Sequence, residues 1–216
     1  MRAFVVAGSP EAHQPVGIAP NAGDFVVAAD LGAQHALAWG WPVHLLVGDL
    51  DSLPREIADA LAARGVETRR VPAAKDETDT ELALAAALDR GAREIVICAA
   101  LGGRVDHLLA NVLLLARPSL VHVDICIADG AETVRLAQAD VARLTVAIAG
   151  AAGDLVSLLP FGADVEGVRT AHLLYPLVDE TLRLGEARGV SNVMTGERAE
   201  VSLTRGRLLV IHNRME

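Results

Sequence analysis

Residues 44–56 read HLLVGDLDSLPRE, and they contain the unit from which the first half of the chain is built. The apolar run at 45–47 is typical of a buried strand. Pro54 suits the first position of a helix, where its missing N–H costs nothing. Asp49 and Asp51 stand between the two segments, where aspartate favours a turn. We therefore predict a strand, an acidic turn and a helix in succession.

The same alternation continues on both sides of this stretch. Thr78 and Glu81 are spaced as a capping box. Gly65 and Gly91 follow predicted helices, as C′ glycines do, and Pro118 ends the last helix. Strands are predicted at 3–7, 25–29, 44–47, 68–71, 94–99 and 121–128, and helices at 33–39, 55–64, 80–90 and 107–117. This order predicts an α/β domain with a mainly parallel, Rossmann-like sheet and helices on both faces.

The pattern changes near residue 130, where helical periodicity disappears. The stretch at 153–160 is apolar or alternating, and Arg205-Gly206 resembles a hairpin turn between two apolar runs. The predicted domains are an α/β domain at 1–132 and an all-β domain at 133–216.

Composition excludes several classes of protein. The chain of 216 residues has a formal net charge of −9, which argues against nucleic-acid binding because phosphate backbones attract dense lysine and arginine. Cys98 and Cys126 lie in apolar runs, as small buried side chains do, and no zinc-ligand cluster is present in the sequence. No uncharged stretch is long enough to span a bilayer, and the first apolar run is too short for a signal peptide. We expect a soluble cytoplasmic protein.

Acidic residues recur at the ends of predicted strands and the starts of helices. Asp49 and Asp51 follow one strand, and Asp76 and Asp79 flank a helix start. Each pair has an ordinary explanation, since aspartate favours turns and is stabilised at helix N-termini. Together they would meet at the carboxyl edge of the sheet, where such folds bind ligands. Mg²⁺ binds one or two carboxylates together with phosphate oxygens, so a magnesium–nucleotide site explains the whole set.

A glycine pair precedes the fourth predicted helix. Gly102 and Gly103 would let backbone N–H groups approach a phosphate, and Arg104 would contact its oxygens. Asp106 has the alternative explanation of a helix N-cap. Asp30, after the second predicted strand, suits a ribose, a base or a metal-bound water, and equally a plain turn.

Taken in order, these segments resemble the thiamine pyrophosphokinase family. The resemblance covers nearly the whole chain, including its C-terminal half. The matching segments are ADLGA at 29–33, VGDLDS at 47–52, KDETDT at 75–80, GGRVDH at 102–107 with Ala110-Asn111, the run at 153–160, GVRT at 167–170, LYPL at 174–177 and GVSN at 189–192. Any one of them is moderately specific, whereas all of them in order are highly specific.

The resemblance implies an α/β catalytic domain that binds ATP and a C-terminal β-sandwich that binds thiamine. It implies Mg²⁺-dependent transfer of pyrophosphate from ATP to the thiamine hydroxyl, with release of AMP, in a homodimer that binds thiamine at the subunit interface. The residues implied are Asp49, Asp51 and Asp79 for the metal; these three and Arg104 for catalysis; Asp30, Asp76, Gly102, Gly103, Asp106 and Asn111 for the nucleotide; and Ser191, Asn192 and Tyr175 for thiamine. Asp79 would lie nearest the thiamine hydroxyl, orienting it or accepting its proton.

Two alternatives stay open at this point. Leu31, Val193 and His172 depart from the family pattern, and the last two lie on the thiamine side. A pyrophosphokinase for another hydroxyalkyl heterocycle, such as a pterin, would change that side and keep the acidic residues. A non-catalytic thiamine diphosphate-binding protein would lose the metal carboxylates, but all of them are present: Asp49, Asp51, Asp76 and Asp79.

Overall fold

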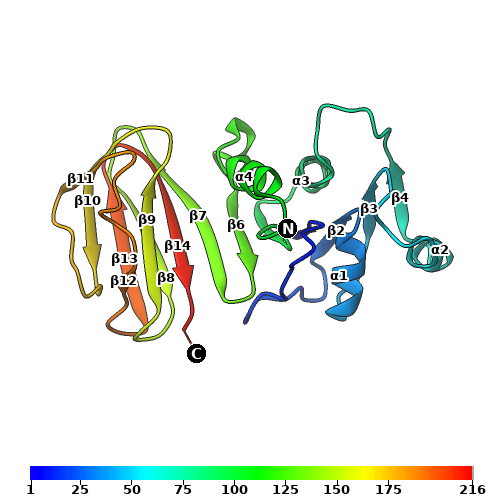
Figure 1. Ribbon diagram of the computed structural model, residues 1–216, viewed down its shortest axis with the longest axis horizontal. Helices are drawn as coiled ribbons and strands as arrows, with labels where there is room; N and C mark the ends of the chain where they lie inside the picture. The colour runs from blue at the N-terminus through cyan, green and yellow to red at the C-terminus, as the bar shows by residue number, and fades with distance from the viewer. Residues whose placement is uncertain (216) are drawn as a thin grey trace. The chain divides into compact units, whose positions relative to one another are not determined.

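The computed structural model describes residues 1–215 and forms two compact units, Met1–Gly130 and Ala131–Glu216. The first unit is α/β, and the second contains strands and no helix among its described residues (Figure 1).

The first unit alternates strands with helices along the chain. Its strands are β1 (Arg2–Val6), β2 (Phe25–Ala29), β3 (Leu45–Gly48), β4 (Glu67–Arg70), β5 (Glu94–Cys98) and β6 (Asp124–Asp129). Its helices are α1 (Gly32–Ala38), α2 (Arg55–Ala63), α3 (Asp79–Asp89) and α4 (Val105–Leu114), followed by a 3₁₀ turn, η1 (Pro118–Leu120).

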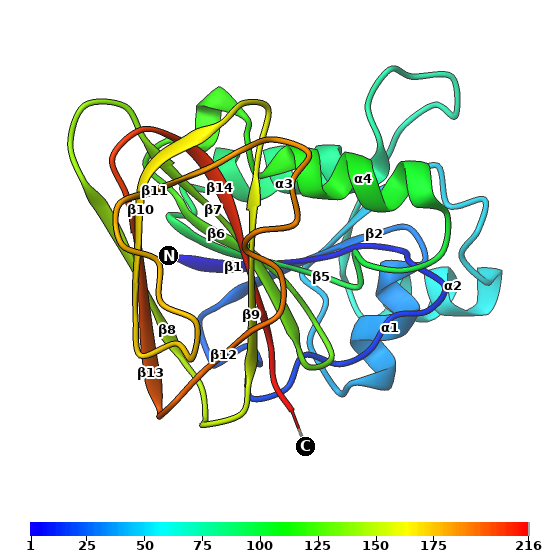
Figure 2. The same cartoon turned by 60° about the vertical axis from the view of Figure 1, so that its left-hand side comes forward.

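These strands pair in parallel, in the order β6-β5-β1-β2-β3-β4. The chain moves outward from β1 to β4 and then returns through α3 to β5, on the other side of β1. α3 packs across β1, β2 and β3. α3 and α4 cover one face of the sheet, and α1 and α2 cover the other (Figure 1 and Figure 2). The N-terminus of α3 therefore lies at the carboxyl edge of the sheet, near the ends of β2 and β3.

Local sequence explains most of these elements. β1 and β2 are almost fully buried, as expected for parallel strands covered by helices on both faces. The Thr78 side chain accepts a hydrogen bond from the N–H of Glu81 at 3.1 Å, so the predicted N-cap of α3 is confirmed. Gly65 and Gly91 have φ of +76° and +80°, the left-handed conformation predicted after a helix.

Most predicted bounds lie within one residue of the observed ones, but those of α4 and β6 differ further, and α4 ends at Leu114, so Pro118 does not end it. Pro54 is the N-cap of α2 and not its first helical residue, because its ψ of 131° is extended. α4 begins earlier than predicted, at Val105, with Arg104 as its N-cap. Asp106 therefore lies inside the first turn of α4 and is not the cap. β6 begins at Asp124, because a turn after η1 occupies residues 121–123.

The core of this unit is mainly aliphatic and rich in alanine. Trp41 packs edge-on against Phe4 and Trp39, with ring centroids 5.3 and 4.9 Å apart.

Among residues 1–215, no helix has both the length and the apolar character needed to cross a bilayer.

The second unit is an antiparallel β-sandwich. Its strands are β7 (Glu132–Ala139), β8 (Leu144–Ala149), β9 (Leu155–Pro160), β10 (Val165–Ala171), β11 (Glu180–Leu182), β12 (Asn192–Val193), β13 (Arg198–Leu203) and β14 (Gly206–Asn213). They form two layers, with the orders β12-β9-β14-β7 and β11-β10-β13-β8. Buried apolar side chains from both layers form its core.

The predicted hairpin at Arg205-Gly206 is wrong. β13 pairs with β8 and β10, whereas β14 pairs with β7 and β9, so the turn carries the chain from one layer to the other. Gly206 has φ +104°, and a Cβ there would lie 2.9 Å from the carbonyl oxygen of Asp164. Glycine is required here because the backbone is left-handed and the Asp164 carbonyl lies close by. A glycine in this role looks the same in sequence as a glycine in a hairpin turn.

Candidate metal and nucleotide site

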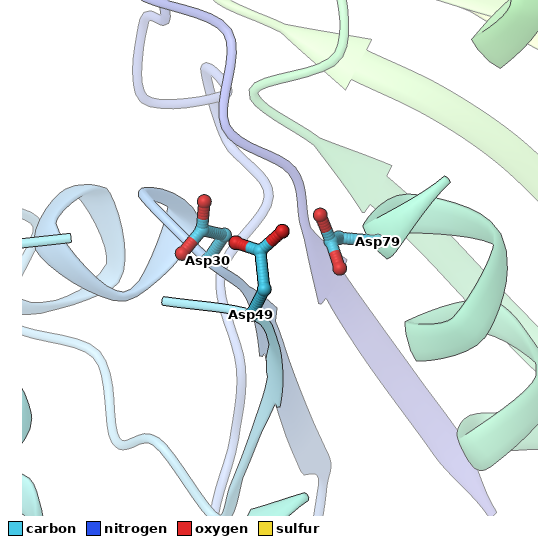
Figure 3. A group of neighbouring side chains, drawn as sticks. All are labelled: Asp30, Asp49 and Asp79. Atoms are coloured by element: carbon cyan, nitrogen blue, oxygen red, sulfur yellow. The ribbon is translucent and has the colours of Figure 1, made fainter. Parts of the chain in front are cut away.

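Three aspartates converge at the carboxyl edge of the parallel sheet. Asp30 follows β2, Asp49 follows β3, and Asp79 begins α3. Each offers a carboxylate oxygen, and these three oxygens lie within 4.8 Å of one another. The carboxyl groups face one another from three separate elements (Figure 3). We call this group the aspartate triad.

The backbone after β3 decides which carboxylate joins the triad. Leu50 has φ +65°, a conformation uncommon for residues with a side chain. It separates Asp49, which belongs to the triad, from Asp51, which is exposed. The backbone N–H of Asp51 still contributes, because it donates to Asp49 Oδ1 at 3.1 Å. The structure therefore brings one carboxylate of this pair into the triad and leaves the other at the surface.

Two glycines allow close packing around the triad. Gly48 has φ +150°, and a Cβ there would lie 3.3 Å from Asp79 Oδ1. At Gly32, a Cβ would lie 2.0 Å from the carbonyl oxygen of Val6, so α1 approaches β1 without any side chain between them. A larger residue at Gly48 would crowd Asp30 and Asp79, and one at Gly32 would push α1 away from β1.

Asp30 is the most buried member of the triad, with 8% of its surface exposed. Its Oδ2 accepts a short hydrogen bond from the Ser52 hydroxyl. Its Oδ1 is buried and has no hydrogen-bond partner among residues 1–215. Burial raises the pKa of Asp30, the Ser52 hydrogen bond offsets part of that rise, and the carboxylates of Asp79 and Asp49 raise the pKa further. A buried oxygen without a partner is costly, and a bound cation would remove that cost.

One cationic side chain already lies beside the triad. Lys75 Nζ is 3.0 Å from Asp79 Oδ1 and 3.8 Å from Asp49 Oδ2. Burial lowers the pKa of Lys75, but its interactions with these carboxylates outweigh burial, so the pKa is raised. The pKa of Asp49 is lowered, first by the backbone N–H of Asp51 and also by Lys75. When Asp30, Asp49, Asp79 and Lys75 are all ionised, this group of side chains has a net charge of −2.

The other nucleotide residues predicted in this unit lie outside the triad. Asp76 is exposed. Arg104 and Asp106 are both exposed and pair with each other at the start of α4, with Nη2 and Oδ2 2.6 Å apart. Asn111 is buried and donates its Nδ2 to the carbonyl of Ala100 at 2.9 Å. That hydrogen bond ties α4 to the residues that follow β5.

The predicted glycine pair forms a left-handed turn between β5 and α4. Gly102 and Gly103 have φ of +87° and +67°. The N–H of Gly103 points at a carboxylate, Oε2 of Glu11, at 3.4 Å. The turn therefore presents a backbone donor to a carboxylate of the chain itself, and its contact with phosphate stays a prediction.

The residues predicted to face thiamine lie in the second unit. Tyr175 and Ser191 are exposed, and Ser191 has φ +58°. Asn192 is buried, and its side chain holds the main chain of Tyr175: Oδ1 accepts from the Tyr175 N–H at 3.0 Å, and Nδ2 donates to the Tyr175 carbonyl at 2.6 Å. Asn192 thus positions the segment that carries the tyrosine ring.

Two residues of the site, Lys75 and Ser52, belong to the motifs quoted above but had no predicted role. Ser52 reaches Asp30 across 22 positions of sequence because β2 and β3 pair in parallel. Lys75 lies in the loop before α3, so its contact with Asp79 depends on the path of that loop, and no local periodicity signals it.

The donors of the triad suit a hard divalent cation. Mg²⁺ binds carboxylate oxygens and usually completes its coordination with water and phosphate oxygens. The triad consists of carboxylates alone, and one buried oxygen of Asp30 lacks a partner. Asp30, Asp49 and Asp79 would hold the ion, at the edge of the sheet where α/β folds bind ligands.

Comparison with known proteins agrees with this geometry. Residues 19–128 match the thiamin pyrophosphokinase catalytic domain, and residues 143–208 match the thiamin pyrophosphokinase vitamin B1 binding domain. Thiamine pyrophosphokinase of Bacillus subtilis (strain 168) is 26% identical over 169 residues, which cover 77% of this chain and 76% of that protein.

Solved structures show the same fold over the full length. A thiamin pyrophosphokinase family protein from Enterococcus faecalis is 30% identical, with a TM-score of 0.84 and 100% of both chains covered. The crystal structure of the Bacillus subtilis enzyme superposes with a TM-score of 0.88 at 24% identity, again over 100% of both chains. This chain therefore belongs to the thiamin pyrophosphokinase family.

Proposed function

We propose that this protein transfers the pyrophosphoryl group of ATP to the hydroxyl of thiamine and forms thiamine diphosphate and AMP. One observation carries the proposal: three carboxylates converge at the carboxyl edge of the sheet in a chain whose halves match the two domains of this family. Family membership supports the reaction, and the triad is where we propose that it takes place.

The reaction requires one bond to form and one to break. The thiamine hydroxyl oxygen attacks the β-phosphorus of ATP, and the bond from that phosphorus to the oxygen of the α-phosphate breaks. AMP leaves with that oxygen, and the hydroxyl proton passes to a base. We assign the base, or the group that orients the hydroxyl, to Asp79.

The proposed metal is Mg²⁺, held by Asp30, Asp49 and Asp79, with the exposed Asp51 in the same turn as Asp49. A bound Mg²⁺ would neutralise phosphate charge as it develops during transfer. Ser52 fixes the orientation of the Asp30 carboxylate through its hydrogen bond. Lys75 holds Asp79 through its ion pair.

The nucleotide side is assigned to the turn before α4. The backbone of Gly102 and Gly103 would contact phosphate oxygens, and Arg104 would exchange its partner Asp106 for phosphate. Asn111 would hold α4 in register through Ala100. Asp76 completes the proposed nucleotide contacts. These assignments fit a Rossmann-like mode of binding, with phosphates near a helix N-terminus.

The thiamine side is assigned to the second unit. We infer that Tyr175 and Ser191 contact thiamine and that Asn192 holds the Tyr175 segment. The proposed domains are residues 1–132 for ATP and catalysis and 133–216 for thiamine. The proposal includes a homodimer with thiamine at the subunit interface and action in the cytoplasm.

The comparisons do not favour the two alternatives considered from sequence. Pterin pyrophosphoryl transfer finds no support among the relatives described above, which are named for thiamine. A non-catalytic role is disfavoured because the triad carboxylates are retained and converge.

The test is to incubate the protein with Mg-ATP and thiamine and to follow AMP formation. AMP and thiamine diphosphate should appear in equal amounts. Thiamine without its hydroxyl is the matched control, and removal of Mg²⁺ with EDTA should abolish the reaction. No AMP with thiamine, or faster AMP release with a hydroxymethylpterin, would contradict the proposal.

A further inference from the structure

Lys75 is the only lysine in this sequence, whose other 18 basic residues are arginines. Elsewhere in the described chain, arginine makes the ion pairs with carboxylates, apart from those of histidine. Lysine and arginine differ physically: lysine carries a compact point charge, whereas arginine carries a planar, forked group. A compact cation is therefore confined to one place, beside the aspartate triad.

Stabilisation of the neighbouring helix, α3, does not explain why the lysine stands at residue 75. Lys75 lies four residues before Asp79, just ahead of the N-terminus of α3. A cation at that end opposes the helix macrodipole, and Lys75 lies outside α3, so it forms no i, i+4 pair within a helix. The Lys75 side chain is nevertheless only 13% exposed, with its ammonium 3.0 Å from Asp79 and 3.8 Å from Asp49. The carboxylates hold it there.

These two carboxylates are also among the three proposed metal ligands. An ammonium at this position stabilises the like charges of the triad when no metal is present. It also repels an incoming divalent cation and occupies oxygens that the metal needs. Nucleotide phosphates would bring negative charge that offsets both effects.

We propose that Lys75 is a positioning residue that keeps the metal affinity of the nucleotide-free protein low, so that Mg²⁺ binds together with the nucleotide. The inference rests on the proposed function of the triad. It makes metal and nucleotide binding mutually dependent, with a coupling that Lys75 sets.

The test measures Mn²⁺ binding by electron paramagnetic resonance, with and without the uncleavable analogue α,β-methylene-ATP. In nucleotide-free protein, Lys75→Met should bind Mn²⁺ about tenfold more tightly than the wild type, because a nearby positive charge is lost. The tightening of Mn²⁺ binding by the analogue should shrink by a similar factor. Lys75→Arg keeps the charge and should stay closer to the wild type.

Arg55→Met is the matched control. Arg55 forms an i, i+4 ion pair with Asp59 at 3.8 Å, and its side chain is 91% exposed, so solvent screens its charge. It should leave Mn²⁺ affinity unchanged. In EDTA, Lys75→Met should have a lower melting temperature than the wild type. Addition of Mg²⁺ should raise the melting temperature of the variant more than that of the wild type.

A second measurement follows the Lys75 side chain by NMR in the unmutated protein. Labelling with ε-¹⁵N-lysine gives one side-chain signal, and that signal should shift saturably as Mg²⁺ is added. The inference would be overturned if Lys75→Met bound Mn²⁺ with unchanged affinity, or if the Lys75 signal did not shift when Mg²⁺ was added. If wild-type protein forms AMP from thiamine and Mg-ATP while either result occurs, the inference alone fails. If AMP never forms, the proposed function fails, and the Mn²⁺ measurement still decides the role of Lys75.

Discussion

Asp154 in the second unit and Asp30 in the first are both buried carboxylates, and their pKa values are shifted in opposite directions. In the second unit, Asp154 accepts hydrogen bonds from the N–H groups of Ala151 and Met215 and from His212 Nε2, at 2.9, 3.0 and 2.9 Å. Burial alone would raise the pKa of Asp154, but these partners outweigh burial and lower it. In the first unit, Asp30 has one donor, Ser52, and a raised pKa.

The difference distinguishes a structural carboxylate from one available to a ligand. Both carboxylate oxygens of Asp154 accept hydrogen bonds from the chain. Asp154 therefore fixes the loop before β9 and the end of β14. The triad keeps an unpartnered oxygen and uncompensated negative charge. Such a site is unfavourable until a cation binds, which is the state expected of a functional site.

The largest expected effect comes from neutralising one member of the triad. Asp49→Asn should reduce AMP formation by about 100-fold or more, because a metal ligand that stabilises transferred charge is lost. Its unfolding free energy should fall only slightly, because the attraction between Asp49 and Lys75 is lost while repulsion among the carboxylates also decreases. Steady-state rates and urea unfolding measure the two quantities.

Asp51→Asn is the matched control, since Asp51 is the exposed neighbour of Asp49 in the same turn. Its effect on turnover should be clearly smaller, because its backbone N–H, which remains, makes the contact to Asp49. Equal losses in both variants would show that Asp51 binds the metal directly.

The next effect falls on stability and not on chemistry. Asp154→Asn should cost about 2 kcal/mol of unfolding free energy, because it breaks a buried pair with His212. Turnover of the folded variant should stay at the wild-type value. Urea unfolding and AMP assays at low temperature separate the two, and a stable but inactive variant would contradict this assignment.

A smaller effect concerns pH and has opposite signs in the two units. The folded pKa of Asp154 is lowered from 3.8, so its stabilisation is present above pH 3.8 and is lost as the pH falls through the folded pKa. The folded pKa of Asp30 is raised from 3.8, so ionised Asp30 costs stability above that pKa, and the cost disappears as the pH falls toward 3.8. In EDTA at neutral pH, Asp30→Asn should therefore gain stability and Asp154→Asn should lose it, and both differences should shrink toward zero in acid. Urea unfolding across this range measures them, and equal signs at neutral pH would refute the contrast.

The smallest expected effect lies at the exposed ring of the second unit. Tyr175 is 57% exposed, so Tyr175→Ala should leave the melting temperature unchanged. If the ring packs on thiamine, the KM for thiamine should rise about tenfold while the KM for ATP stays constant. An unchanged thiamine KM would remove Tyr175 from the substrate site.

Local patterns predicted the parts of the fold that local forces decide. The Thr78 cap, the glycines after α2 and α3 and the buried β1 and β2 each follow from a few neighbouring residues. The turn before β14 was predicted wrongly, because a glycine that crosses between layers looks the same in sequence as one in a hairpin.

The site shows the same limit. Convergence of acidic residues at one edge followed from the β–α alternation. The choice of Asp49 over Asp51 depends on the left-handed backbone of Leu50, and no propensity of leucine predicts that conformation. The roles of Lys75 and Ser52 depend on pairing between segments, which periodicity does not specify.

The central claim is that the aspartate triad holds the divalent ion that binds the nucleotide. The most direct test is anomalous diffraction at the manganese edge from crystals grown with Mn²⁺ and α,β-methylene-ATP. The account predicts an anomalous peak within coordination distance of carboxylate oxygens from Asp30, Asp49 and Asp79, with analogue phosphates beside it. A peak held by other residues, or bound analogue with no metal at the triad, would contradict it.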